Sequence, residues 1–280
     1  MLFPRSTFVL YEYDPSLAAA VIFAALFILT TEFHFHQRFR SHAKYFNPFI
    51  VGGVFQVIGY IARAKAHFDQ TSTTLYSVQT LLLLLAPTLY AASIYMVLGR
   101  IITFLNAPHL SVVPVNWMTK IFVSGDILSF ILQGAGGGIM ANGSTSSMKI
   151  GQWVIVVGLC VQLLFFGAFL IASITFHCRI NQNPTAESDK TISSAKRCLP
   201  KDWRGLLFAC YFVSVLILIR SVYRPIESMK FFLYLLDASM MFLVMLTMNL
   251  FHPSIVLQDG VYHQHLDLEE LSLRREGGDE

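Results

Sequence analysis

A carboxylate and an amide lie seven residues apart in the stretch Ile121–Gly138, which is otherwise apolar enough to be buried in lipid. Asp126 and Gln133 are separated by almost two helical turns, so both side chains lie on one helix face. Inserting an ionisable group into a bilayer costs about 3 kcal/mol unless it meets a partner, a cavity or a proton. Gly134 and Gly138 form a small-xxx-small pair at which another helix can pack closely. We therefore expect Asp126 to be the functional carboxylate of a pocket inside a membrane.

Other apolar stretches carry polar residues that could share this pocket. Gln56, Tyr60 and Arg63 are spaced four and three residues apart, which places them on one helix face. Asp237 is the best match in depth as a partner for Arg220 or Arg63. The amides of Gln56, Gln133 and Gln162 are expected nearer to Asp126 than any arginine. The candidate pocket for an amphipathic ligand comprises Asp126, Gln133, Gln56, Tyr60, Arg63, Gln79, Arg220, Arg224, Glu227 and Asp237. The alternative is a set of interhelical ties with arginines that reach toward the membrane surface.

No pattern typical of catalysis or metal binding accompanies these residues. His34 and His36 are two residues apart, and the chain contains no HxxxH, HExxH or GxSxG motif. The four cysteines form no CxxC pair. We therefore expect no metal, no cofactor and no enzymatic activity.

The composition favours an integral membrane protein. Of the 280 residues, 55% are hydrophobic and 13% are charged, whereas a typical soluble domain has about 25% charged residues. The mean hydropathy of +0.57 agrees with this class. A net charge of +3 gives no support for a nucleic-acid partner.

Seven apolar runs predict an all-α membrane protein built as a bundle of seven transmembrane helices. Pro87 lies near the middle of the third run and should kink that helix. A segment 1–15 precedes the transmembrane domain 16–257, and an acidic tail 258–280 follows it. The expected helices cover about 16–35, 45–64, 75–103, 117–140, 150–177, 203–223 and 231–251.

The distribution of Lys and Arg predicts the orientation. Thirteen of these residues fall on the side that follows the first, third, fifth and seventh helices, and seven fall on the other side. Because positively charged loops stay in the cytoplasm, we expect the N-terminus outside and the C-terminal tail in the cytoplasm.

Several segments resemble the fungal RTA-like family, named for resistance to aminocholesterol and also called the lipid-translocating exporter family. They are QVIGYIAR (56–63), YSVQTLLLLLAPTLYAASIYMVLGRII (76–102), IFVSGDILSFILQGAGGG (121–138), LILIRSVYRPIE (216–227), YLLD (234–237) and HPSIVL (252–257). The resemblance implies seven helices and the export or flipping of amphipathic lipids such as sphingoid long-chain bases, or resistance to toxic lipids. It implies membrane lipids as partners, sphingoid bases or sterol-like amphiphiles, and the plasma membrane as location, with endoplasmic reticulum or vacuole as alternatives.

Two features depart from the family pattern. Gln56 stands where the family usually has Glu, and the segment from Glu227 to Asp237 is about ten residues shorter than usual. A seven-helix receptor or sensor of lipids or stress signals stays open as an alternative, whereas the missing metal motif disfavours an intramembrane lipid hydrolase. A translocator needs a continuous polar track that reaches Asp126, and a receptor needs only an outer pocket.

Overall fold

The computed structural model describes residues 17–68, 73–140, 145–188, 203–223, 231–254 and 257, and these residues form helices without any strand. Two short 3-10 helices, η1 (Lys44–Phe46) and η2 (Pro108–Leu110), lie between longer ones. The long helices are α1 (Leu17–Ser41), α2 (Asn47–Ala66), α3 (Thr73–Phe104), α4 (Val115–Met140), α5 (Thr145–Gln182), α7 (Trp203–Tyr223) and α8 (Phe231–Leu250).

Within this part of the chain, six helices are long and apolar enough to cross a membrane, and α8 adds the shorter apolar stretch Leu236–Leu250. The all-α membrane class is therefore confirmed. Seven spans and the orientation of the termini stay predictions, and the segments 1–15 and 258–280 lie outside the described residues.

Two helices extend beyond the ends suggested by hydropathy. α1 continues past residue 35 to Ser41, and α5 continues past residue 177 to Gln182. Gln37 donates from Nε2 to the Asn249 backbone oxygen at 2.9 Å, and Arg179 donates from Nη1 to the Leu110 oxygen at 3.2 Å. The last turns of α1 and α5 lie beyond the apolar residues of these helices, and polar contacts with neighbouring elements stabilise them.

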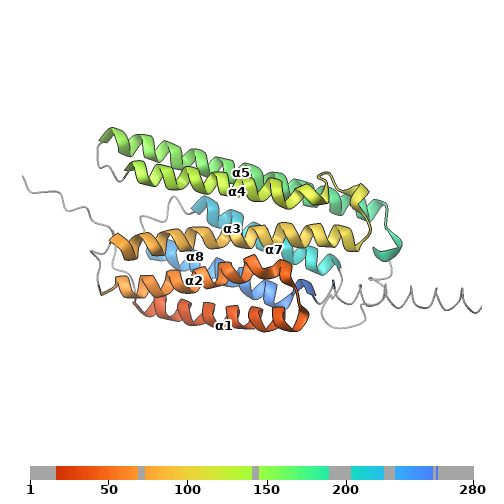
Figure 1. Ribbon diagram of the computed structural model, residues 1–280, viewed down its shortest axis with the longest axis horizontal. Helices are drawn as coiled ribbons and strands as arrows, with labels where there is room; N and C mark the ends of the chain where they lie inside the picture. The colour runs from red at the N-terminus through yellow and green to blue at the C-terminus, as the bar shows by residue number, and fades with distance from the viewer. Residues whose placement is uncertain are drawn as a thin grey trace, which may run out of the picture.

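α3 runs through the middle of the bundle (Figure 1). The pair α4 and α5 packs on one side of it, and α2 packs on the other side with α1 behind. α7 contacts α3 and α8, and α8 also contacts α1. α1 and α8 run in parallel, because His34 and Gln37 of α1 meet Met245 and Asn249 of α8 in the same order along both helices.

Aromatic rings fill the core on both sides of α3. Tyr90 packs against Phe49 of α2 with ring centroids 4.6 Å apart. Tyr95 packs against Phe169 of α5 at 4.5 Å, and Phe122 of α4 completes this second group. Five residues turn a helix by about 140°, so Tyr90 and Tyr95 point to different neighbours of α3.

The expected helix contact at Gly134 and Gly138 is wrong. A Cβ atom built at either position would meet nothing within 4 Å. Gly136 makes the close approach instead, since a Cβ there would lie 2.7 Å from the Gly151 oxygen of α5. Positions 134 and 138 each lie two residues from 136, about 200° around the helix, and so face away from α5.

Candidate functional site

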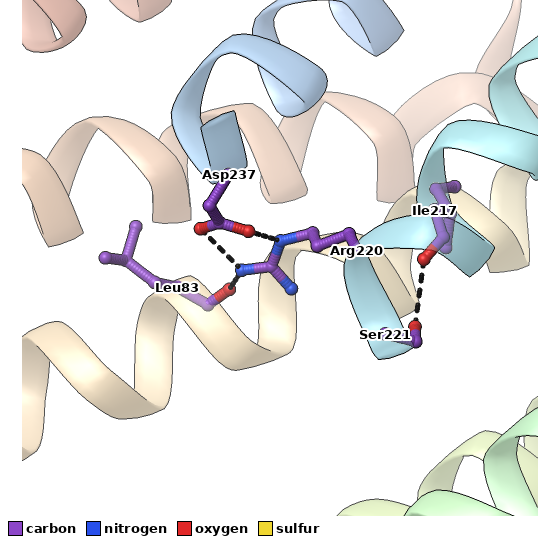
Figure 2. A network of polar contacts seen from close by, with 5 residues as sticks. All are labelled: Leu83, Ile217, Arg220, Ser221 and Asp237. Atoms are coloured by element: carbon purple, nitrogen blue, oxygen red, sulfur yellow. Dashed lines mark hydrogen bonds and ion pairs between the residues drawn. The ribbon is translucent and has the colours of Figure 1, made fainter. Parts of the chain in front are cut away.

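A buried ion pair joins α7 to α8. Arg220 Nε lies 2.6 Å from Asp237 Oδ1, and Nη2 donates to Asp237 Oδ2 at 3.3 Å. Figure 2 shows the guanidinium facing the carboxylate through both contacts. The pairing of Asp237 with a bundle arginine is confirmed. Removing one partner of such a pair costs about 3–5 kcal/mol, because the other charge is left buried.

A backbone carbonyl completes the surroundings of Arg220. Nη2 donates to the Leu83 oxygen of α3 at 2.9 Å, so one guanidinium connects three helices (Figure 2). Tyr90 lies seven residues, about two turns, further along the same face of α3 as Leu83. The Tyr90 hydroxyl is buried and has no hydrogen-bond partner among the described residues.

Gln56 of α2 lies at the level of this ion pair. The flanking Gly59 packs against Leu83, and Gly52 packs against Tyr90 and the Ala86 oxygen. Gln56 is 1% exposed, and neither Oε1 nor Nε2 has a hydrogen-bond partner in the described part of the chain. An unsatisfied buried amide costs about 1–3 kcal/mol, which a polar ligand would recover. We call Gln56, Tyr90, Arg220 and Asp237 the polar cluster.

The other expected pocket residues are placed as follows. Tyr60 stacks on Phe27 of α1 with centroids 5.1 Å apart, and Arg63 and Gln79 are buried. Arg224 and Glu227 lie outside the described residues. The structure thus brings Arg220, Asp237 and Gln56 to one level of the bundle.

Asp126 lies in a different place. It is 4% exposed on α4, and its Oδ2 accepts a hydrogen bond of 3.0 Å from the Tyr95 hydroxyl of α3. The described partner of Asp126 is thus a phenolic hydroxyl, neither one of the expected amides nor an arginine. Gln56 belongs to the polar cluster, and Gln133 and Gln162 bond each other further along α4 and α5.

Gln133 and Gln162 are parts of a tie between α4 and α5. Gln133 Nε2 donates to Ser129 Oγ at 2.8 Å and to Gln162 Oε1 at 3.1 Å. Ser129 Oγ in turn donates to the Gly158 oxygen at 2.8 Å. Asp126 and Gln133 do share the buried face of α4, but Gln133 already has protein partners.

α3 separates Asp126 from the polar cluster. Leu83 and Tyr95 are twelve residues apart, about 18 Å along the helix and about 120° around it. Phe122 and Phe169 pack around Tyr95. The contacts of the ion pair and those of Asp126 thus lie at different levels and on different faces of α3.

Two tyrosines of α3, Tyr90 and Tyr95, were not among the residues expected in the pocket. A hydroxyl in an apolar run needs a partner when it is buried, so Tyr90 and Tyr95 were detectable as polar groups in a run without charges. Which of them would meet Asp126 depends on the rotation of α3. Among the described residues, no three side chains of His, Cys, Asp or Glu converge as a metal site.

Comparisons with known proteins identify a family for this chain. The family model described as "RTA1 like protein" matches residues 49–260. The chain is similar to Protein RTA1 of Saccharomyces cerevisiae, with 33% identity over 90% of this chain and 87% of the relative. It is also similar to Protoporphyrin uptake protein 1 of the same yeast, with 33% identity over 87% and 92%.

A third relative, the Sphingoid long-chain base transporter RSB1 of Saccharomyces cerevisiae, is 27% identical over 75% of this chain and 64% of its own length. No solved structure matches. The names of two of these relatives describe uptake or transport. The chain belongs to the RTA1-like family.

Proposed function

We propose that this member of the RTA1-like family exports or flips amphipathic lipids such as sphingoid long-chain bases, and in this way gives resistance to toxic lipids. The name of one relative, a sphingoid long-chain base transporter, supports this substrate class. The observation that carries the proposal is the polar cluster: a buried amide without a partner lies level with a buried ion pair in an apolar bundle. Such a cluster suits a polar head group whose tail stays in lipid.

A sphingoid base presents a cationic amine, hydroxyl groups and a long apolar tail. The Gln56 amide can both donate to and accept from a hydroxyl, and the Tyr90 hydroxyl can do the same. Asp237 shares its charge with Arg220, whereas the described partner of Asp126 is the neutral Tyr95 hydroxyl. Asp126 is therefore the candidate for binding the amine at a second position in the bundle, separated by α3 from the polar cluster, with Gln133 on the same face. The route that the lipid follows through the bundle has further candidate lining residues, namely Tyr60, Arg63 and Gln79.

The proposed site of action is the plasma membrane, where export lowers the amount of a toxic lipid in the cell. The endoplasmic reticulum and the vacuole are the alternatives. Light microscopy of a fluorescently tagged chain distinguishes these compartments, and a signal restricted to internal membranes would limit the proposal to flipping between leaflets.

Efflux of a fluorescent sphingoid base tests the function. Cells that make the protein should lose the loaded lipid faster than cells without it. Gln56→Leu keeps the volume and removes the orphaned amide, so we expect unchanged or higher thermal stability and about tenfold slower efflux. Equal efflux with and without the protein overturns the function. Normal efflux by Gln56→Leu, with protein-dependent efflux intact, overturns only the assigned site.

The same cells separate the proposed substrate from another amphiphile. Asp126→Asn keeps the shape but cannot ionise, so it should reach the membrane in normal amount and lose protection against sphingoid bases. Because one relative is named for protoporphyrin uptake, porphyrin fluorescence should be measured in parallel. Protein-dependent porphyrin uptake without sphingoid-base efflux would replace the proposed substrate class.

A further inference from the structure

Pro87 interrupts the hydrogen bonding of α3 without interrupting the helix. α3 is continuous from Thr73 to Phe104 with Pro87 inside it. Proline has no backbone N–H, so the carbonyl four residues earlier, that of Leu83, lacks its donor within the helix. In a membrane such a freed carbonyl needs a donor from a neighbouring segment.

Arg220 supplies that donor. Its Nη2 lies 2.9 Å from the Leu83 oxygen, and the same nitrogen reaches Asp237 Oδ2 at 3.3 Å. Leu83 is 3% exposed, so solvent does not compete for the carbonyl. Figure 2 shows the guanidinium between the carbonyl and the carboxylate. The acceptor used by Arg220 is thus the one that the proline leaves open.

The packing of α2 fixes this turn of α3 from another side. A Cβ atom at Gly59 would lie 2.7 Å from Leu83 Cδ2, and one at Gly52 would lie 3.1 Å from the Ala86 oxygen. Two glycines of α2 therefore let the helices approach closely on both sides of Gln56. The open carbonyl, the guanidinium and the orphaned amide are held at the same level.

We propose that Pro87 is a positioning residue for the polar cluster. By lacking an N–H it keeps the Leu83 carbonyl available to Arg220, and this third contact fixes the guanidinium against Asp237. With an N–H at position 87, the carbonyl also accepts a hydrogen bond within α3, and this second donor competes with Arg220 for the same oxygen. The inference rests on the proposed function only in that the polar cluster binds the head group.

Thermal unfolding of the purified full-length protein in detergent tests the contact without any substrate. Arg220→Gln should lower the Tm in the wild-type background and lower it by a smaller amount in a Pro87→Ala background, because only the contact with the Leu83 oxygen depends on Pro87. Thr88→Ala is the matched control, because Thr88 bonds the Leu85 oxygen at 2.6 Å in the same turn. Arg220→Lys replaces Arg220→Gln if the latter does not fold. Equal losses of Tm in all three backgrounds overturn the inference.

Replacing the amide at position 87 by an ester separates the N–H from the ring. Lactic acid at position 87 has the alanine side chain and no N–H. We expect Pro87→Ala to weaken binding of the fluorescent sphingoid base by about tenfold, and the lactic acid variant to bind within about twofold of wild type. Equal weakening in both variants overturns the positioning role. If wild type binds no sphingoid base, the proposed function fails, and the Tm comparison still decides the role of Pro87.

Discussion

Arg220 and Asp237 show how far single residues could be read from the sequence. Their pairing was predictable because each lies at a similar depth in an apolar run and a buried charge needs a partner. The contact with the Leu83 carbonyl was not foreseen, because every residue has a backbone oxygen and the sequence alone does not show which one a side chain will meet. The bond between Asp126 and Tyr95 was missed because it depends on which face of α3 turns toward α4.

His252 should make the stability of the bundle depend on pH. It follows α8, its Nδ1 lies 2.6 Å from Ser254 Oγ, and its ring is 6.3 Å from that of His34. Burial lowers the pKa of His252 from its ordinary 6.5 to about 4. Between these values the unfolded chain binds a proton that the folded chain does not, so stability falls as the pH drops from 6.5 to 4, by at most about 3 kcal/mol.

His252→Asn should remove this part of the pH dependence, because the Asn oxygen can still accept the Ser254 N–H while the side chain does not titrate. Tm values at pH 7.5 and 5.0 check this. The wild type should lose more Tm on acidification than the variant, and equal losses would mean that other groups cause the acid sensitivity.

The helices themselves were more predictable than their contacts. Apolar runs of spanning length marked the helices, and the expected range 203–223 agrees with α7. Helix rotation was not predictable from small residues, because Gly134 and Gly136 look alike in the sequence and only Gly136 faces α5. Polar spacing was the better guide, since Asp126, Ser129 and Gln133 mark the buried face of α4.

The two glycines of α4 give a matched pair of variants. Gly136→Ala should lower the Tm, because the new Cβ would lie 2.7 Å from the Gly151 oxygen and 3.0 Å from the Ile155 nitrogen, and backbone atoms cannot rotate away. Gly134→Ala should be neutral or stabilising by up to about 1 kcal/mol, since alanine favours helix and the site is open. A lower Tm for Gly134→Ala alone would reverse the packing assigned to this helix.

For the whole molecule, the excess of Lys and Arg on one side predicts the N-terminus outside and the tail in the cytoplasm. Protease treatment of sealed, right-side-out cells should leave a tag placed after Glu280 intact. The same tag must be digested in lysed cells. Digestion of the tag in sealed cells would invert the topology and with it the side from which the polar cluster is reached.

The parallel contact between α1 and α8 joins residues 211 positions apart, His34 and Met245. Of the described helices, α8 leaves the ribosome last, so it arrives when the others are already in the bilayer. Until then a nascent chain carries Arg220 without Asp237 and His34 without the Met245 carbonyl. An intramembrane cation without its partner distinguishes an unfinished chain from a finished one. Docking of α8 is therefore the step that neutralises Arg220 and gives His34 its partner.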